Sequence, residues 1–436
     1  GRQDFLRLNG IYIWLFFYFQ AAKKFFHISQ PIKLKKLIKE GKILYFKNKT
    51  WVALALSMVM VFSLMAGCGG GAGDSDKAAG DTIKLGFLGA TTGSVANYGI
   101  PGEKGMKLAI KEINAEGGVL GKQLQGIYED NKGDNTEIAN ITTKYITRDK
   151  VAALIGDPCT GLTKVAADIA QKNQVVIFSS GATGDGVVEI GDYVFRNTLL
   201  DIFAVPAVVD WMLDDQGWEK VAVITSLNNG YSTALTPVFK KSLEARNANI
   251  VIEESVNDGE TDFTAQVTKL KNSGADVLVF TGYYTEAALI MNEAQKQNLD
   301  IKLIGGDGLY GQDLAKLGLS AVEEKVIFYC GFATDQPSPE TAAFLEKYRA
   351  EYNEEPDMFS AQYYDAVYII ADAMEKSGSA DPTVYRDELA QLKDYPGVSG
   401  QTTFRADREP VKSPVFLMTV KDGQFALVNK IPVEVE

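Results

Sequence analysis

The stretch from Val151 to Thr183 constrains the fold more than any other part of this chain, because it contains a complete β-α-β unit. Its two short apolar runs, Ala152–Ile155 and Val175–Phe178, are typical of strands buried on both faces of a parallel sheet. Between them, Leu162–Lys172 repeats its apolar residues at helical spacing. The stretch therefore predicts an open, mostly parallel α/β sheet.

Each of the two predicted strands is followed by a loop of small polar residues, Asp157–Thr160 after the first and Ser179–Thr183 after the second. Parallel strands end at the same edge of a sheet, where open α/β proteins bind small ligands, so we expect the two loops to lie side by side. Hydroxyl groups, a glycine and free backbone N–H groups at helix starts suit a carboxylate or another small anion. The sequence thus predicts a small-molecule site at this edge.

Strands and helices alternate along the rest of the chain, which predicts two parallel sheets with helices on both faces. The other expected strands are 83–89, 123–128, 193–197, 221–225, 250–253, 275–280, 302–304 and 326–329. The expected helices are 102–116, 136–148, 204–213, 233–245, 263–272, 286–297, 311–317, 339–352, 360–376 and 383–392, and residues 90–100 are expected to form a loop. The final strands, 415–421 and 425–430, flank Asp422-Gly423, a pair typical of a type I′ hairpin turn.

Charge and histidine content exclude several classes of protein. Residues 1–67 carry 11 basic and 2 acidic side chains, so the remaining chain carries 33 basic and 54 acidic side chains, which argues against binding nucleic acid or anionic lipid. The single histidine, His27, precedes the folded body, which therefore has neither Ser-His-Asp nor Cys-His catalysis and no His-ligated metal. Cys68, Cys159 and Cys330 have no metal-binding or disulfide spacing. We expect no metal and no cofactor.

Residues 44–67 are predicted to be a secretory signal, because Lys47 and Lys49 precede the apolar run 51–67 and small residues end it. The end of this run, Leu64–Cys68, resembles the lipobox of bacterial lipoproteins, in which the cysteine is lipidated and becomes the new N-terminus. The alternative is a transmembrane anchor, for which the run is short. We therefore predict that Cys68 is the lipid attachment site.

Of the segments on either side of the signal, only the one after it is predicted to be part of the mature protein. Residues 1–43 are interpreted as translated leader sequence that is not part of the mature protein. The alternative is an extra membrane helix at 11–19, but its apolar run is shorter than the roughly 20 residues that span a bilayer. Residues 68–81, which consist of the lipidated cysteine and a Gly-, Ala- and Asp-rich stretch, are predicted to be a flexible tether.

Seven motifs, in order and at matching spacings, make the chain similar to a known family. They are GATTGSVANYG (89–99), INAEGGVLGKQL (113–124), IGDPCT (155–160), SSGAT (179–183), TDFTAQVTKLKNSGADVLVFTGYY (261–284), GGDG (305–308) and FSAQYYDAVY (359–368). From 83 to about 430 the chain resembles periplasmic-binding-protein type I solute receptors, specifically the leucine/isoleucine/valine-binding proteins of branched-chain amino-acid ABC transporters. The resemblance implies two lobes that close on a ligand: lobe 1 is 82–201 plus 334–400, and lobe 2 is 202–333 plus 401–436.

The resemblance also implies which residues hold the carboxylate and the ammonium of an amino-acid ligand. By this resemblance, Thr160, the backbone of Gly181 and Thr183 bind the ligand's carboxylate. The alternative role for the two threonines is helix N-capping. By the same resemblance, Asp307 binds the ligand's ammonium, because an ammonium that leaves water needs a paired carboxylate. Tyr283 maps beside Asp307 and could add a hydroxyl or cation–π contact. The alternatives are a solvated turn for Asp307 and a surface loop aromatic for Tyr283.

The remaining implied contacts form an apolar pocket and lid for an aliphatic side chain. They are Tyr98, Pro158, Cys159, Tyr231 and Phe359, any of which is alternatively an ordinary core residue. In some relatives the cysteine at position 159 forms a disulfide, but the partner position here is Lys132. Cys159 is therefore expected to be a free thiol.

The resemblance implies a binding protein and not an enzyme. We expect a monomer, lipid-anchored outside the cytoplasmic membrane, that captures leucine, isoleucine, valine or a similar amino acid for an ABC permease and its ATPase. It touches the membrane only through the anchor and binds no nucleic acid. The alternatives are the same fold with an amide, urea or another carboxylic or amino acid as ligand, and a sensory receptor for a signalling partner. An α/β-hydrolase is disfavoured, because the body has no histidine and no G-x-S-x-G motif.

Overall fold

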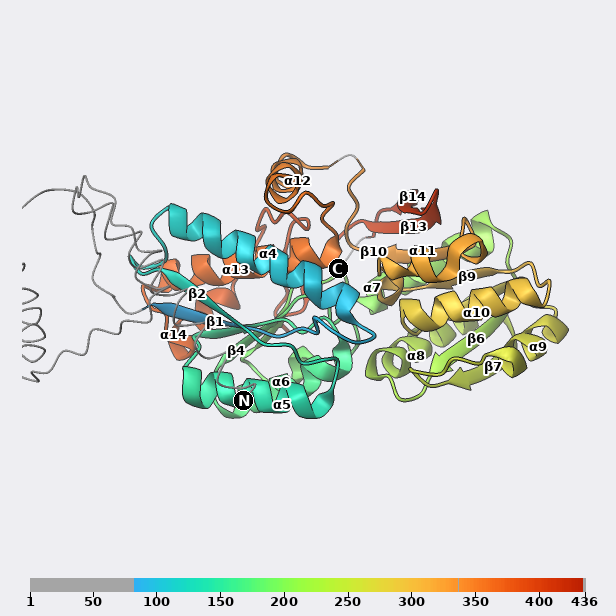
Figure 1. The fold of residues 1–436 in the computed structure, drawn as a ribbon, viewed down its shortest axis with the longest axis horizontal. Helices are drawn as coiled ribbons and strands as arrows, with labels where there is room; N and C mark the ends of the chain where they lie inside the picture. Colours follow the sequence, from blue (N-terminus) through green and yellow to red (C-terminus); the bar gives the residue numbers. More distant parts are fainter. Residues whose placement is uncertain (1–81, 336, 434–436) are drawn as a thin grey trace, which may run out of the picture. The chain divides into compact units, whose positions relative to one another are not determined.

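The computed structural model describes residues 82–335 and 337–433 (Figure 1). The chain divides into two units, 1–76 and 77–436, and every described residue belongs to the second. The predicted leader, signal peptide, lipidated Cys68 and tether lie outside the described residues and stay predictions. Within the described part, no helix is both long and apolar enough to cross a membrane.

The first sheet is entirely parallel, as predicted, with the strand order β2-β1-β3-β4-β5. Its strands are β1 Ile83–Phe87, β2 Leu124–Tyr128, β3 Ala153–Ile155, β4 Val176–Ser179 and β5 Val194–Arg196. In Figure 1, α5 and α6 lie on one side of this sheet and α4 and α13 on the other. The helices are α4 Ala96–Ala115, α5 Asn135–Lys144, α6 Thr160–Lys172, α13 Met358–Ser377 and α14 Pro382–Leu389. The predicted β-α-β unit is therefore present as β3, α6 and β4.

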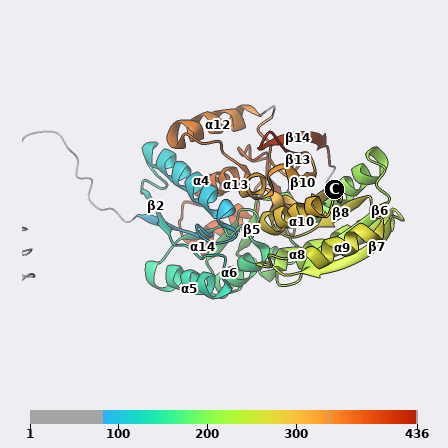
Figure 2. The ribbon, with the colours of Figure 1, turned by 45° about the vertical axis from the view of Figure 1, so that its right-hand side comes forward.

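The second sheet has seven strands in the order β14-β13-β10-β9-β8-β6-β7. They are β6 Lys220–Ser226, β7 Asn249–Val256, β8 Val277–Phe280, β9 Lys302–Gly305, β10 Val326–Cys330, β13 Val415–Lys421 and β14 Gln424–Ile431. Its helices are α7 Asp201–Asp210, α8 Gly230–Ala245, α9 Thr264–Ser273, α10 Tyr284–Lys296 and α11 Asp313–Gly318; Figure 2 shows α8, α9 and α10 beside β6 and β7. The hairpin prediction is confirmed, because Asp422 and Gly423 have the positive φ angles of 52° and 71° that a type I′ turn requires.

Alternate residues of the second sheet pack against different helices. Val221 and Val223 of β6 belong to the core that contains α7 and α8, whereas Ala222 and Ile224 belong to the core that contains α9 and α10. Because successive side chains of a strand point to opposite faces, a strand covered on both faces is apolar at every position. This explains why the strand sequences are continuous apolar runs.

Helix α4 begins six residues before the predicted start, so the loop expected at 90–100 is shorter than predicted. Gly99 and Pro101 are turn signals that lie within this helix. Packing overrides them: a Cβ at position 99 would lie 2.0 Å from the Ala90 oxygen, so only glycine lets the helix approach the β1–α4 loop this closely. The consequence is that Tyr98 lies on a rigid helix instead of a loop.

The chain passes between the two sheets after β5, after β10 and before β13. The last passage follows α12 Pro339–Tyr352, α13, α14 and a small hairpin, β11 Thr403–Phe404 and β12 Pro410–Val411, which the sequence did not predict. The Phe404 ring packs against Phe178 and Phe195, with ring centroids 6.2 and 5.8 Å apart, so the hairpin lies on the first sheet. The lobe boundary at 400/401 stays a prediction.

Candidate functional site

The two polar loops after β3 and β4 lie side by side, as the parallel sheet requires. Asp157 holds them together: its Oδ1 accepts the Cys159 N–H at 2.8 Å, and its main-chain oxygen accepts the Ser179 hydroxyl at 2.7 Å. Its Oδ2 accepts the Asn131 amide at 2.6 Å. Burial raises the pKa of Asp157 to about 6, and these hydrogen bonds lower it only in part. Asp157 thus fixes the shape of the first loop.

Thr160 and Thr183 do not cap helices. The N-cap position of α6 is Cys159, which makes no side-chain cap, and Thr183 precedes the 3₁₀ turn Val188–Ile190 by several residues. Instead, the Thr160 hydroxyl accepts the N–H of Gly184 at 3.2 Å, and this bond joins the first loop to the second. The helix-capping alternative is therefore wrong for both threonines.

Asp307 follows β9 and is 6% exposed, so the alternative of a solvated turn residue is wrong. The Thr183 hydroxyl lies 3.5 Å from its Oδ1 and is oriented to donate to it. The pKa of Asp307 is raised well above its ordinary value, chiefly by burial and then by the negative charge of Asp201. A buried carboxylate thus faces the polar loops from the second sheet.

A small cavity of about 10 Å³ lies between the loops of the two sheets. This is about the room that one water molecule needs. The wall from the first sheet consists of Tyr98, Pro158, Gly181 and Phe359; the wall from the second consists of Tyr231, Tyr283, Asp307 and Gly308. Seven of the ten residues predicted as ligand contacts thus surround one cavity, and Gly308 is an addition to them.

Four of the eight residues that line this cavity are aromatic. Tyr231 and Tyr283 stack with their centroids 5.7 Å apart, and Tyr98 packs on Phe359 at 4.7 Å. The Tyr98 hydroxyl donates to the Gly308 oxygen at 2.5 Å, which joins a helix of the first sheet to a loop of the second. Tyr283 is therefore part of the cavity wall and not a surface loop aromatic.

The other three predicted contacts, Cys159, Thr160 and Thr183, are buried next to the cavity but do not line it. Cys159 is a free thiol, as expected, and Cys330 is also free. Burial raises the pKa of the Cys159 thiol well above its ordinary value. Cys159 is therefore an apolar neighbour of the site, not a reactive thiolate.

Asp201 is a buried carboxyl group near Asp307 that the sequence did not reveal. It is the first residue of α7 and is 1% exposed, and its Oδ1 accepts the Tyr329 hydroxyl at 2.7 Å. Its Oδ2 has no hydrogen-bond partner among the described residues. Burial raises its pKa, and its charge raises that of Asp307. The only sequence signal was an acidic residue before an apolar helix, which is common at helix starts.

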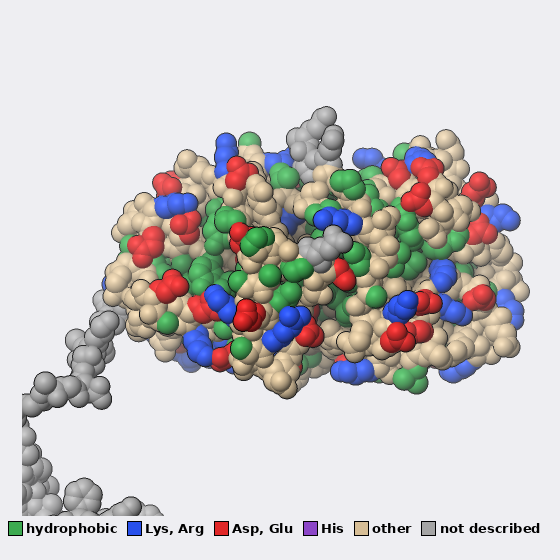
Figure 3. Space-filling view, turned by 90° about the horizontal axis from the view of Figure 1, so that it is seen from above, with side chains coloured by type: hydrophobic (Ala, Val, Ile, Leu, Met, Phe, Trp, Pro, Cys, Tyr) green, Lys and Arg blue, Asp and Glu red, His purple; other side chains and the backbone are tan. Residues whose placement is uncertain are grey.

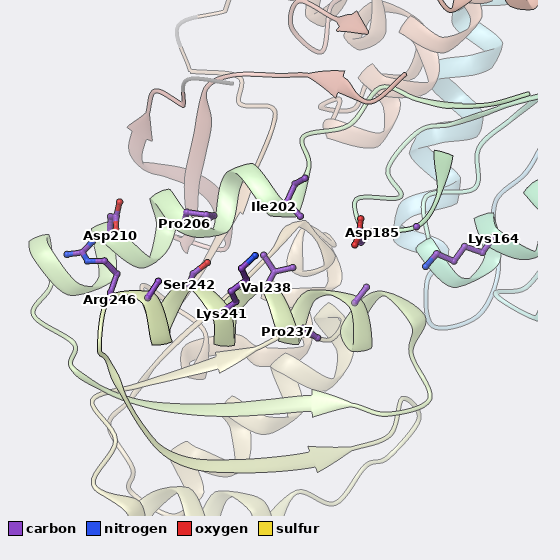
Figure 4. Close-up of a pocket in the computed structure, with 13 residues that line it drawn as sticks. Lys164, Asp185, Ile202, Pro206, Asp210, Pro237, Val238, Lys241, Ser242 and Arg246 are labelled. Atoms are coloured by element: carbon purple, nitrogen blue, oxygen red, sulfur yellow. Dashed lines mark hydrogen bonds and ion pairs between the residues drawn. The ribbon is translucent and has the colours of Figure 1, made fainter. Parts of the chain in front are cut away.

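A larger groove of about 820 Å³ lies on the surface, lined largely by α7 and α8 (Figure 4). Figure 4 shows Pro206, Val238 and Ile202 along it and the ion pair of Arg246 with Asp210 at one end. None of the ten predicted contacts lines this groove. Size alone would favour it, but the smaller cavity is the one where buried polar and aromatic groups converge. Across the described ranges, no three His, Cys, Asp or Glu side chains form a metal site.

A family model described as "Periplasmic binding protein" matches residues 82–424. The chain belongs to the periplasmic binding protein family. The leucine-, isoleucine-, valine-, threonine- and alanine-binding protein of Pseudomonas aeruginosa is 29% identical over 312 residues, which are 71% of this chain and 83% of that protein. The predicted resemblance is thereby confirmed.

Solved structures agree with this family and with the predicted α/β fold. The branched-chain amino acid transporter substrate-binding protein LivJ of Streptococcus pneumoniae, solved with isoleucine, is 36% identical, with a TM-score of 0.75 over 81% of this chain and 99% of that one. The leucine-binding protein LivK of Thermotoga maritima is 26% identical, with a TM-score of 0.77 over 80% and 99%.

Proposed function

We propose that this protein captures a branched-chain or similar aliphatic amino acid between two lobes and delivers it to an ABC importer. The observation that carries the proposal is the small cavity between the two walls: Gly181 lines one wall, the buried carboxyl group of Asp307 lines the other, and the Thr183 hydroxyl lies behind the first wall, 3.5 Å from Asp307 Oδ1. A zwitterion needs both kinds of partner within a few ångströms. The similarity to leucine-, isoleucine- and valine-binding proteins supports the same ligand class.

The carboxylate of the ligand is assigned to the loops of the first sheet. Thr160 and Thr183 supply hydroxyl donors. Gly181 lines the cavity without a side chain, and a Cβ there would lie 2.8 Å from the Cβ of Pro158. Hydrogen bonds to an ionised group are shorter and stronger than neutral ones. These donors therefore hold a carboxylate without a permanent counter-charge.

The ammonium of the ligand is assigned to Asp307, with the unpaired Oδ2 of Asp201 as a second acceptor. Two buried carboxylates repel each other, and an ammonium between them removes that repulsion. The stacked rings of Tyr231 and Tyr283 add a face that attracts cations. Tyr98, Pro158, Cys159 and Phe359 are assigned to the aliphatic side chain.

Entry of a ligand requires the two walls to separate, because the cavity holds about one water molecule. The contacts that must break are those of Tyr98 with Gly308 and of Asn97, whose amide donates to the Tyr284 hydroxyl and to Asp313, both at 2.9 Å. These bonds join α4 to α10 and α11. Opening and reclosing at this edge is the motion that we propose for capture and release.

We further propose that the mature protein is a monomer outside the cytoplasmic membrane, anchored through lipid on Cys68 and the tether 69–81. Its partners are the permease and the ATPase of the importer, and it is not an enzyme. On the face drawn in Figure 3, acidic and basic side chains are interspersed without a large patch of either sign. A nucleic-acid site needs a continuous basic surface, so this face does not support one.

Leucine binding is expected to release protons and to weaken at acid pH. The raised pKa values of Asp201 and Asp307 mean that the free site binds protons more readily than ordinary aspartates, whereas a bound ammonium favours the ionised carboxylates. Protons and ligand therefore compete, and affinity falls by at most about tenfold per pH unit for each proton released. Calorimetric titration between about pH 7.5 and 5.5, in buffers with different ionisation heats, measures both effects. Failure of leucine, isoleucine and valine to bind at either pH contradicts the proposed function.

A further inference from the structure

Arg196, at the end of β5, is the largest fully buried side chain in the described part of the molecule and is 2% exposed. Its Nη1 donates to the Ala182 oxygen at 2.8 Å and to the Gly184 oxygen at 2.6 Å. These two carbonyl groups belong to the residues on either side of Thr183. One guanidinium therefore holds the backbone on both sides of a proposed ligand contact.

Glu409 occupies the remaining side of this guanidinium. Its Oε2 accepts the Arg196 Nε–H at 2.7 Å, and its Oε1 pairs with Nη2, so the ion pair is bidentate. Glu409 lies immediately before β12, in the hairpin that packs on the first sheet. A buried cation needs such a partner, because an unpaired one would be unfavourable in a dry environment. The pair thus links the small hairpin to the loop that carries Thr183.

We infer that Arg196 and Glu409 are positioning residues for the ligand's carboxylate. Neither lines the cavity. They act through the backbone at 182–184. Other hydrogen bonds of this backbone are those from the Ala182 N–H to the Ser179 hydroxyl and from the Gly184 N–H to the Thr160 hydroxyl. The inference rests on the proposed function, since it gives these residues a role only if Thr183 binds ligand.

The geometry of arginine is essential to this role. Its planar group carries five N–H donors in a fixed fork, and here that fork serves two carbonyl groups and a carboxylate at once. Lysine in its place keeps the charge, but its compact ammonium cannot span all three acceptors. Arg196→Lys therefore loosens the loop while it leaves a cation beside Glu409.

A second buried charge cluster offers a matched control. Lys412 is 5% exposed and donates to the Ser399 hydroxyl at 2.9 Å, and Asp365 of α13 accepts the N–H of Ser399 at 2.8 Å. This cluster joins α13 to the segment before β13, close in sequence to Glu409. The side-chain partners of Lys412 are Ser399 and Gly400, not the loop 182–184, and the cluster does not line the cavity. Its disruption therefore tests general destabilisation without touching the proposed site.

The experiment compares full-length protein with Arg196→Lys, Glu409→Gln and Lys412→Met in leucine titrations and thermal unfolding. We expect Arg196→Lys and Glu409→Gln to raise the leucine dissociation constant about 10- to 100-fold, the loss seen when outer partners of metal ligands are removed. Lys412→Met is expected to lower the melting temperature but to change the dissociation constant by less than about threefold. In a double mutant with Arg196→Lys, Thr183→Val is expected to cost less affinity than it does alone, because coupled residues are not additive.

Two results would overturn the inference: a folded Arg196→Lys or Glu409→Gln protein that binds leucine like wild type, or an equal loss of affinity in Lys412→Met. If Arg196→Lys does not fold, Glu409→Gln decides, since it changes only the outer partner. A wild-type protein that does not bind leucine contradicts the proposed function instead, so the two failures are distinguishable.

Discussion

Asp307→Asn is expected to raise the dissociation constant for leucine by about 30-fold to several-thousand-fold, which corresponds to roughly 2–5 kcal/mol. Asparagine keeps the shape and hydrogen-bonding capacity of the side chain but removes its charge. Because Asp307 is buried, water cannot replace it as a partner for the ammonium. Asp201 retains part of the negative charge, so the loss is not complete. Calorimetric titration of leucine into the variant measures the effect.

Thr183→Val is the matched control for this variant, because the Thr183 hydroxyl lies against the same carboxylate. It is expected to weaken leucine binding by less, since backbone N–H groups still hold the ligand's carboxylate. If Asp307→Asn instead binds leucine within about threefold of wild type, the site carries no buried ammonium. A neutral amide or a carboxylic acid would then describe the ligand better.

Cys68→Ala is expected to move the protein from the membrane into the soluble fraction or to leave an unprocessed precursor. The physical reason is that anchoring needs lipid: each buried CH₂ contributes only about 0.8 kcal/mol, so two or more acyl chains are required for stable attachment. Cell fractionation followed by mass measurement of the N-terminal fragment checks the result.

Ser75→Ala is the control for this variant, since it changes a small polar residue in the same tether and leaves the predicted attachment site intact. It is expected to stay in the membrane fraction. A Cys68→Ala protein that is processed normally and still membrane-bound would contradict the lipoprotein assignment. The run 51–67 would then be better described as a transmembrane anchor.

Local patterns predicted the parts of the fold that depend on neighbours in sequence. The runs at 152–155 and 175–178 are β3 and β4 because apolar residues at every position are buried on both faces of a sheet. The turn at Asp422-Gly423 was predictable from the φ angles that these residues tolerate. The position of the two polar loops side by side at one edge of the sheet was predictable because parallel strands end at the same edge.

Features that depend on distant residues could not be predicted in this way. Arg196 and Glu409 are 213 positions apart, and neither has a local pattern that indicates a buried ion pair. Asp201 lies near the site only because α7 brings it next to Tyr329 of β10, 128 positions later in the chain. The early start of α4 depends on close packing at Gly99, which no periodicity reveals. The family resemblance supplied Asp307, which local reasoning would have placed in a solvated turn.

Titration of the purified protein with leucine and with its deaminated analogue, 4-methylpentanoate, measures what the ligand's ammonium group contributes to binding. The two compounds share the carboxylate and the aliphatic side chain and differ only in the ammonium group. We expect leucine to bind at least about 30-fold more tightly, because only leucine has an ammonium group to pair with Asp307 and Asp201. If 4-methylpentanoate or benzoate binds as tightly as leucine, or more tightly, the protein is not a receptor for a zwitterionic amino acid.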